Sequence, residues 1–356
     1  MWACATEMRF SRLWSNDVDP AGDGVGGGAV VEEPGSEAVA STPIRVTVAV
    51  PTFRRPAQLS RVLAAILSQS VFERDFVQLA LDIDVLVIDN DPAGGAREAV
   101  ARLQPTVGYV VEPTPGVAAV RNRALDEAAS SRLLIFVDDD EEPTHRWLEE
   151  LVGFWTVGQP DAVAGKVVSV FPVERNAWLT AARAFERPER LTGQPMRAAA
   201  TNNLLLDLAS IRRRELRFDE RFGLSGGEDA LFTAQLSAAG GLILWCDEAL
   251  VIDHTAAERM TRRWFLVRAF RTGSVQAAIN TRLARPSRSG LRVRLQCSAG
   301  GIGRMTVGVS AFTLGVMLGS LRHRALGAKL IARGAGLLSG SLGHLHQEYS
   351  IRRRRP

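Results

Sequence analysis

Hydrophobic and polar residues follow a regular strand-and-helix pattern from residue 44 onward. The segment 44–50, IRVTVAV, alternates β-branched residues and predicts a strand that stops at Pro51. Residues 56–69, PAQLSRVLAAILSQ, place apolar side chains at the spacing of one helix face, after a proline that suits the first helical turn. The first unit is therefore predicted to be a strand, a short loop and a helix.

The same unit recurs further along the chain. Strands are predicted at VLVIDN, GYVVE and RLLIFVDDD, with GAREAVARL and GVAAVRNRALDEAA as helices between them. Strands that alternate with helices form a mostly parallel sheet with helices on both faces, so we expect an α/β fold. Ligands of such sheets bind at the carboxyl ends of the strands, where the polar clusters PTFRR, DND and DDDEE fall.

Beyond residue 162 the alternation becomes less regular. AVAGKVVSVF, TNNLLLDL and LILWC are predicted strands, ALFTAQLSAAGG a helix ended by Gly240, and RWFLVRAFRTGSVQAAINTRL a basic amphipathic helix. Residues 305–321 carry no charge over seventeen positions, and spaced leucines then predict an amphipathic helix before the final arginines. Seventeen residues lie at the lower limit for crossing a bilayer, so an interfacial hairpin, a packed helix pair and a membrane span all stay open.

Composition sets the expected boundaries of these parts. Residues 1–42 are rich in Gly, Pro, Ser and acids without apolar periodicity, which predicts a disordered leader. We expect an α/β domain over 43–282, a linker over 283–300, an apolar or amphipathic helical extension over 301–348 and a basic tail over 349–356.

Charge is divided unevenly along a chain whose net charge is +4. Residues 1–254 hold 24 Lys and Arg against 37 Asp and Glu, whereas residues 255–356 hold 19 against 2. A basic C-terminal third beside an acidic body predicts attraction to anionic lipid, phosphate or nucleic acid. A general preference of the chain for arginine is the alternative explanation.

Cysteine content and the first residues indicate the compartment. Cys4, Cys246 and Cys297 are few, odd in number and far apart, which argues against a disulfide framework and a zinc cage. The first twenty residues contain no apolar run of the kind found in secretory signals. We therefore expect a cytoplasmic protein, with membrane association left open.

A run of acids from Asp138 to Glu142 follows a predicted apolar strand directly. Carboxylates so close together raise one another's pKa unless a cation neutralises them. A hard divalent ion, Mg²⁺ or Mn²⁺, suits oxygen ligands and keeps positions free for substrate phosphates. A solvated acidic loop is the alternative, but the position of the run at a strand end favours metal binding.

Arginines and an aspartate near other strand and helix ends are further candidates. Thr52, Arg54 and Arg55 follow the first strand, where an arginine can bind a phosphate or stack on a base. Asp89 ends another strand and suits a nucleobase or a ribose hydroxyl, and Arg121 near a predicted helix start can reach a diphosphate. Turn chemistry, a helix cap and an exposed helix arginine are the structural alternatives.

A glycine-rich turn leads into the predicted helix of the segment RFGLSGGEDALF. Its glycines allow a substrate to approach closely, and the helix N-terminus favours an ionised carboxylate at Glu228 or Asp229 that can act as a base. The same letters also make an ordinary helix start with acids in the first turn. His254, in VIDHTAAER, can complete a metal shell or serve as a capping or core residue.

These motifs, in this order, resemble those of the inverting GT-A glycosyltransferases of family 2. The matching series is PTFRRP, VIDND, PGVAAVRNRAL, FVDDDEEP and SGGEDALF with the DH that follows, over residues 44–275. FERPERLTG, TNNLLLD and FDERFGLSGGEDALF are similar to the exopolysaccharide branch of succinoglycan-type β-glucosyltransferases. The resemblance implies a Rossmann-like GT-A fold, a DxD motif and transfer of a hexose from a nucleotide sugar with inversion.

The resemblance also implies a role for each matching residue. Pro51, Thr52 and Arg54 in the first loop, and Asp89 after the next strand, would hold the nucleoside. Arg121 would lie near the base or the phosphates.

The acidic motifs are implied to hold the metal and to supply the base. Asp138 matches a position at the ribose or the metal, Asp139 one that shares the ribose role, and Asp140 one on the metal, a Mn²⁺ or Mg²⁺ ion. His254 matches a further metal ligand of some relatives. Asp229 matches the general base, which would take the proton of an acceptor hydroxyl opposite the leaving nucleoside diphosphate.

The resemblance and the division of charge together indicate the partners. The expected donor is a UDP-sugar, with GDP-mannose and dTDP-sugars as alternatives, and the expected acceptor is a saccharide, either free or linked to polyprenyl diphosphate. An anionic membrane surface beside the basic third would place the enzyme at the inner face of the plasma membrane. Nucleic-acid binding is not expected, because the aromatic residues Trp264, Phe265 and Phe270 lie on a helix-like stripe typical of a core.

Two other functions compete with this interpretation. A nucleotidyltransferase needs a glycine-rich triphosphate loop after its first strand, and PTFRRP has no glycine. A nucleotide-sugar or polysaccharide-binding protein without catalysis is the second alternative. The joint presence of Asp138, Asp140 and Asp229 argues against it.

Overall fold

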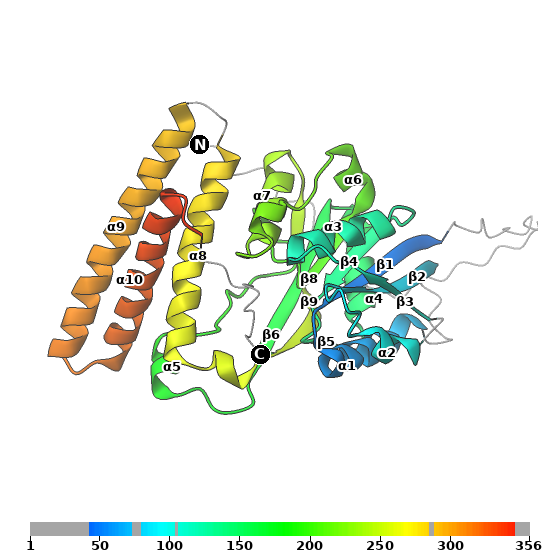
Figure 1. Ribbon diagram of the computed structural model, residues 1–356, viewed down its shortest axis with the longest axis horizontal. Coiled ribbons are helices and arrows are strands. Elements are labelled where there is room, and N and C mark those ends of the chain that lie inside the picture. The colour runs from blue at the N-terminus through cyan, green and yellow to red at the C-terminus, as the bar shows by residue number, and fades with distance from the viewer. Residues whose placement is uncertain (1–42, 73–79, 104–105, 285–287, 346–356) are drawn as a thin grey trace, which may run out of the picture. The chain divides into compact units, whose positions relative to one another are not determined.

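The structure, a computed structural model, describes residues 43–72, 80–103, 106–284 and 288–345. The predicted leader over 1–42 and the basic tail over 349–356 lie outside the described residues. Figure 1 shows a sheet with helices against it, and a group of long helices formed by the C-terminal third.

A nine-stranded sheet carries the predicted motifs. Its strands follow the order β3-β2-β1-β4-β8-β6-β9-β5, with β7 paired to β9. Strands β1 to β4 run parallel, β8 lies antiparallel between β4 and β6, and β9 runs parallel to β6 and antiparallel to β5 and β7. The predicted mostly parallel sheet is thus confirmed. The strands are β1 (Ile44–Thr52), β2 (Leu81–Asp89), β3 (Val107–Val111), β4 (Leu133–Val137), β5 (Glu141–Pro143), β6 (Ala162–Val170), β7 (Pro195–Met196), β8 (Asn203–Asp207) and β9 (Ile243–His254).

Helices cover both faces of this sheet, because side chains along each strand alternate between the faces. On β1, Val46 and Val48 pack in the same apolar cluster as α1, α2 and α4, whereas Ala49 packs with α3, α6 and α7. Coverage of both faces was expected from the sequence and is confirmed. The helices are α1 (Pro56–Leu67), α2 (Arg97–Ala101), α3 (Val117–Glu127), α4 (Trp147–Gly158), α6 (Leu208–Arg213) and α7 (Glu228–Ala238).

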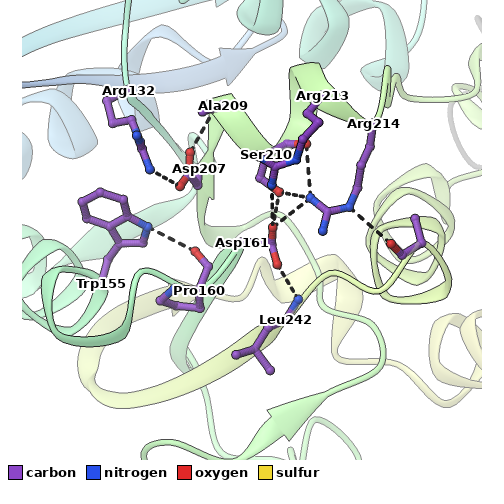
Figure 2. Close-up of polar contacts among 11 residues, drawn as sticks. Arg132, Trp155, Pro160, Asp161, Asp207, Ala209, Ser210, Arg213, Arg214 and Leu242 are labelled. Atoms are coloured by element: carbon purple, nitrogen blue, oxygen red, sulfur yellow. Dashed lines mark hydrogen bonds and ion pairs between the residues drawn. The ribbon is translucent and has the colours of Figure 1, made fainter.

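Asp161 connects neighbouring segments at the edge of the sheet opposite the predicted motifs (Figure 2). It lies just before β6 and accepts hydrogen bonds from Ser210 Oγ and, at 2.9 Å, from Arg214 Nη1. Its other oxygen accepts the backbone N–H of Leu242 at 2.6 Å. Burial opposes ionisation, but these donors together lower the pKa of Asp161 below its ordinary value.

Asp207 closes the same edge at the end of β8. Arg132 Nη2 donates to Asp207 Oδ2 at 2.6 Å, and the N–H of Ala209 donates to Asp207 Oδ1 at 3.0 Å, which caps α6. The Arg132 guanidinium also lies 5.2 Å from the ring centroid of Trp155. Every carboxylate oxygen of Asp161 and Asp207 therefore has a donor.

The C-terminal third forms α8 (Arg262–Leu283), α9 (Arg288–Met317) and α10 (Leu321–Ser341), and α10 packs against both others. The linker predicted over 283–300 is wrong, because α9 begins at Arg288, shortly after α8 ends. Pro286 precedes α9, and the leucines and arginines that follow it favour helix although the stretch is polar overall. The extension predicted over 301–348 contains the rest of α9 and all of α10.

Glycines form the closest contacts between α9 and α10. A Cβ on Gly308 would lie 2.9 Å from the carbonyl oxygen of Gly327, and one on Gly334 would lie 2.5 Å from that of Gly301, so only glycine fits there. Large apolar side chains of α9 are exposed instead: Leu291, Leu295, Ile302, Val307, Val309, Phe312, Leu314, Val316 and Met317. Among the described residues, no helix has the length and hydropathy needed to cross a membrane.

Candidate active site

The acidic run fills the turn between β4 and β5 and continues into the first two residues of β5, at the carboxyl edge of the sheet. Thr52, the last residue of β1, donates a hydrogen bond from Oγ1 to Asp139 Oδ2 at 2.8 Å. Arg55 donates from Nη1 to Asp139 Oδ1 at 3.0 Å and to Asp140 Oδ2 at 3.1 Å. The turns after β1 and β4 therefore meet, as expected for neighbouring parallel strands.

Arg121 of α3 connects the acidic run to α7. Its Nη2 lies 3.8 Å from Asp138 Oδ1, and its Nη1 is paired with Glu228, the first residue of α7. Arg121 and Glu228 are 5% and 3% exposed, so their contact is nearly shielded from water. One guanidinium thus balances two carboxylates from segments far apart in the sequence.

The carboxylic acids around Arg121 resist ionisation. Part of the Asp138 side chain reaches solvent, yet desolvation and neighbouring acids raise its pKa to about 6 against the opposing charge of Arg121. Burial and then the charge of Asp229 raise the pKa of Glu228 to about 7, again opposed by Arg121. Burial and the charge of Asp138 hold the pKa of Glu141 well above its ordinary value. Burial is therefore the main reason that these acids resist ionisation, and repulsion between them adds to it.

Asp229 stands at the N-terminus of α7, directly after a glycine turn. Gly227 has a φ of 92°, and a Cβ on it would lie 2.2 Å from Val275 of α8, so this position requires glycine. Asp229 is partly exposed, and its charge acts on both Asp138 and Glu228. A carboxylate accessible to a ligand thus lies beside the acidic cluster, at the first turn of α7.

The three predicted metal ligands, Asp138, Asp140 and His254, lie at this edge. Asp140 Oδ2 is 3.4 Å from Arg259 Nη2, and the backbone N–H of His254 donates to the carbonyl of Asp140 at 3.1 Å. The His254 ring lies 2.9 Å from Glu142 Oε2. Within the described ranges, no three His, Cys, Asp or Glu side chains form a ready metal cage.

The donor set nevertheless fits a hard divalent cation. Mg²⁺ and similar ions are commonly held by one or two carboxylates together with the phosphates of a substrate. Asp138 and Asp140 are neighbouring carboxylates, and the charge of Asp140 contributes to the raised pKa of Asp138. A cation would relieve this repulsion, which is the physical reason that the acid run suits a metal.

Asp89 and Arg54 lie at the same edge, and both already form hydrogen bonds with the loop after β2. Asp89 is fully buried, and its Oδ2 accepts hydrogen bonds from Tyr109 Oη at 2.8 Å and from the N–H of Ala96 at 2.9 Å. Arg54 Nε donates to Asp91 Oδ2 at 2.9 Å. A nucleoside that uses Asp89 must therefore share or replace a hydrogen bond that the loop already makes.

The structure also identifies site residues that the sequence prediction did not select. Of the two adjacent arginines, Arg55 contacts the acidic run, whereas the selected Arg54, with a left-handed φ of 57°, does not. Glu228 was considered only as an alternative to Asp229 as the base, and Arg259 was assigned no role. The selected Pro51 belongs to β1 itself, one residue before the site.

Comparison with known proteins identifies the family. Residues 47–217 match the family described as Glycosyl transferase family 2. The chain is 28% identical over 306 residues to the succinoglycan biosynthesis protein ExoM of Rhizobium meliloti (strain 1021), which covers 84% of this chain and 94% of that protein. It is 28% identical over 133 residues to the glycosyltransferase AglE of Haloferax volcanii, which covers 36% of this chain and 40% of that protein.

Among solved structures, the chain is similar to the mannosyltransferase PcManGT from Pyrobaculum calidifontis in complex with GDP-Man and Mn²⁺. The TM-score is 0.54 at 15% identity, with coverage of 84% of this chain and 88% of that one. This similarity concerns the fold and confirms the GT-A architecture expected from the motifs. The chain therefore carries a glycosyl transferase family 2 domain over residues 47–217, and it is a glycosyltransferase.

Proposed function

We propose that the protein is a metal-dependent, inverting hexosyltransferase that moves a sugar from a nucleoside diphosphate to a hydroxyl of a saccharide acceptor. The observation that carries this proposal is the partly exposed carboxylate of Asp229 beside the cluster of Asp138 and Arg121. The similarity to a succinoglycan biosynthesis protein supports a role in exopolysaccharide or glycoconjugate synthesis. The donor that we propose is a UDP-sugar, which the resemblance of the motifs implies.

Asp229 is the residue best suited to act as the base. Its neighbour Glu228 is 3% exposed and is held by Arg121, so it is not accessible to an acceptor. Asp229 would take the proton of the acceptor hydroxyl while the hydroxyl oxygen bonds to the anomeric carbon. The bond from that carbon to the diphosphate oxygen breaks on the opposite face, so the configuration inverts in one displacement.

Cationic side chains surround the place where the diphosphate would leave. Arg121, Arg55 and Arg259 each contact an acid of the cluster and bring positive charge to this edge. In the proposal they stabilise the charge that develops on the leaving nucleoside diphosphate. A bound Mn²⁺ or Mg²⁺ ion, held by Asp138, Asp140 and His254, would neutralise part of the same charge.

The nucleoside would lie over the carboxyl ends of β1, β2 and β4. The proposed contacts use Thr52 and Asp139, which already hydrogen bond to each other, and Arg54, which donates to Asp91 of the loop after β2. The remaining proposed contacts come from Pro51 and Asp89, at the ends of neighbouring strands.

The C-terminal helices would bring the enzyme to a membrane that presents a polyprenyl-diphosphate-linked acceptor. The exposed apolar side chains of α9 and the basic residues of the last third support binding to an anionic membrane surface, at the cytoplasmic face. The helices α9 and α10 form a hairpin, with glycine contacts between the two helices and large apolar residues on the outside. This arrangement is typical of helices that face lipid.

Release of nucleoside diphosphate from a panel of nucleotide sugars, with Mn²⁺ or Mg²⁺, tests the catalytic proposal. We expect turnover of one donor that requires the metal. Asp140→Ala is expected to weaken donor binding, whereas Asp229→Asn is expected to keep donor binding and lose turnover. Donor binding without release, even with lipid-linked saccharide acceptors, would favour the non-catalytic binding protein instead.

Flotation with vesicles that contain phosphatidylglycerol tests the membrane proposal. Val309→Glu places a charge on the exposed apolar face of α9, where the side chain is 53% exposed, so folding should be unaffected. We expect this variant to float far less than wild type. The matched control is Val157→Glu on α4, which is 73% exposed and lies outside the hairpin. Equal flotation of both variants would contradict membrane binding through α9.

A further inference from the structure

A cavity of about 290 Å³ lies between the sheet and the C-terminal helices. Its walls come from β6 and β9, from the segment after α5 (Ala177–Ala181), and from α8 and α10. The residues that matter for its chemistry are five cations and two acids, namely Arg183, Arg187, Arg268, Lys329, Arg333, Glu186 and Asp253.

As far as the structure describes the chain, three of these cations form no ion pair, although Asp253 and Glu186 act on Arg268 and Lys329 from a longer distance. Arg183 is paired with Glu186, and Arg187 Nη2 lies 3.4 Å from Asp253 Oδ2. In the part of the chain that the structure describes, no ion pair is found for the other three cations, which are Arg268, Lys329 and Arg333. The cavity therefore holds an excess of positive charge that a multiply charged anion would neutralise.

The burial of Arg268 makes this excess of positive charge energetically unfavourable. Burial, followed by the charges of Arg271, Arg187 and Arg259, lowers the pKa of Arg268 to about 10. Burial and the charge of Arg333 also lower the pKa of Lys329. Such shifts mean that the protonated side chains repel one another, and an anion bound among them would be favoured.

The segment after α5 is shaped toward the cavity by an unusual backbone. Arg183 and Phe185 have left-handed φ angles of 51° and 65°, which non-glycine residues adopt rarely. Phe185 stacks on Trp264 of α8, with ring centroids 5.7 Å apart and an angle of 13° between the planes. The cavity thus has an aromatic wall next to its cationic side chains.

The cavity borders the acidic cluster of the proposed active site. Asp253 pairs with Glu141 in the register of β5 and β9, and its charge contributes to the raised pKa of Glu141. Arg259 lies 3.4 Å from Asp140 and also acts electrostatically on Arg268. A ligand in this cavity would therefore lie next to the catalytic edge, and Lys329 and Arg333 would connect it to the α9–α10 hairpin.

We infer that this cavity binds the diphosphate of a polyprenyl-diphosphate-linked acceptor. Arginine and lysine side chains are the usual partners of phosphate oxygens, and arginine can bind two of them at once. The aromatic wall formed by Phe185 and Trp264 would pack against the adjoining sugar or isoprenoid. This inference rests on the proposed glycosyl transfer for the identity of the acceptor, but the anion site itself is defined by Arg268, Lys329 and Arg333.

The test is calorimetric titration of the full-length protein with farnesyl diphosphate, a short soluble isoprenoid diphosphate. Excess UDP and Mg²⁺ are present throughout, so that binding at the donor site does not contribute. We expect Arg268→Gln and Arg333→Gln each to weaken binding about tenfold or more. Arg322→Gln is the matched control, because Arg322 is an exposed arginine of α10 that does not line this cavity, and it should bind as wild type does.

Each outcome decides between the possible sources of the phosphate. Binding of farnesyl diphosphate that inorganic pyrophosphate displaces, and that both cavity variants lose, supports the inference. No binding by wild type, or equal binding by all variants, overturns it. Displacement by phosphatidylglycerol vesicles as effective as that by pyrophosphate would overturn it in favour of a lipid headgroup. Failure of the donor assay would instead reject the proposed glycosyl transfer, because farnesyl diphosphate binding requires no turnover.

Discussion

At the two edges of the sheet, the pKa values of carboxyl groups are shifted in opposite directions. At the edge before β6, Asp161 accepts hydrogen bonds from Ser210, Arg214 and Leu242, and its pKa is lowered. At the carboxyl edge, desolvation and neighbouring acids raise the pKa of Asp138 to about 6, and burial followed by nearby acids raises that of Glu228 to about 7. Arginines are present at both edges, so their presence alone does not explain the difference.

The difference lies first in burial, which raises the pKa of Asp138 and Glu228 most, and then in how many acids share each cation. Asp161, just before β6, pairs with Arg213 and Arg214, and Asp207, at the end of β8, pairs with Arg132. Backbone N–H groups donate to both aspartates. At the other edge Arg121 is shared by two carboxylates in a cluster that contains several more. A satisfied network stabilises the fold, whereas a surplus of charge costs stability and is retained where a ligand uses it.

The largest expected effect is on turnover at the carboxyl edge. Asp229→Asn removes the proposed base without removing a buried contact, so we expect kcat to fall about 10³-fold. The free energy of unfolding should change by less than about 0.5 kcal/mol, because the side chain is partly exposed. Steady-state kinetics and urea unfolding check both values. Retention of more than a tenth of kcat would remove Asp229 from the role of base.

Removal of the shared cation should cost the most stability. Arg121→Met leaves Asp138 and Glu228 without their counter-charge, and we expect a loss of about 3 kcal/mol in urea unfolding. The control at the other edge is Arg132→Met, whose side chain is 42% exposed and whose ion pair with Asp207 should contribute about 1 kcal/mol or less. Equal losses for the two variants would contradict the idea that charge is balanced differently at the two edges.

At the edge before β6, a substitution should lower stability and leave turnover unchanged, which is the reverse of the result expected for Asp229→Asn. Asp161→Asn loses the charge-assisted hydrogen bonds to Arg214 and Ser210, which should destabilise the protein by about 2 kcal/mol. We expect kcat and the KM for the donor to stay within about twofold of wild type. The exposed Asp82→Asn variant is the control for stability. A large fall in kcat of Asp161→Asn at full folding would show that the two edges are coupled.

The smallest expected effect is a dependence of stability on pH. The pKa of Glu228 is about 7 in the folded protein against an ordinary value of 4.5, so the folded state binds more protons between these values. Its contribution is therefore complete below about pH 4.5 and is lost as the pH rises through about 7. In EDTA without nucleotide, we expect wild type to melt about 3 °C higher at pH 5.5 than at pH 8 relative to Glu228→Gln. The same pH dependence in both proteins would contradict a raised pKa at Glu228.

Much of the site was readable from local sequence, because it depends on where strands end. The segments 44–50, 85–90 and 132–140 were predicted as strands of a mostly parallel sheet, and their carboxyl ends do lie at one edge. The acid run and the ED pair could be located for the same reason. The prediction of a linker over 283–300 is wrong, because a polar segment rich in leucine and arginine can still form a helix. Here α9 begins at Arg288.

Contacts between distant segments could not be predicted in this way. Arg54 and Arg55 are chemically alike and adjacent in the sequence. Arg54, which has a left-handed backbone, nevertheless donates to Asp91, whereas Arg55 donates to Asp139. The pairing of Arg121 with Glu228 joins residues 107 positions apart, and no periodicity reports such a contact. The cationic cavity likewise draws its residues from two strands, two helices and a connecting segment.

The amino-acid sequence by itself determined the α/β alternation, the positions of the polar strand ends and the family, because these follow from local periodicity and motif order. Only the tertiary structure decided which charges meet, since burial and distance control electrostatic energy. It placed Arg55 on the acidic run and gave Arg121 two carboxylates. It also left Arg268, Lys329 and Arg333 facing one cavity, which no reading of neighbouring residues could reveal.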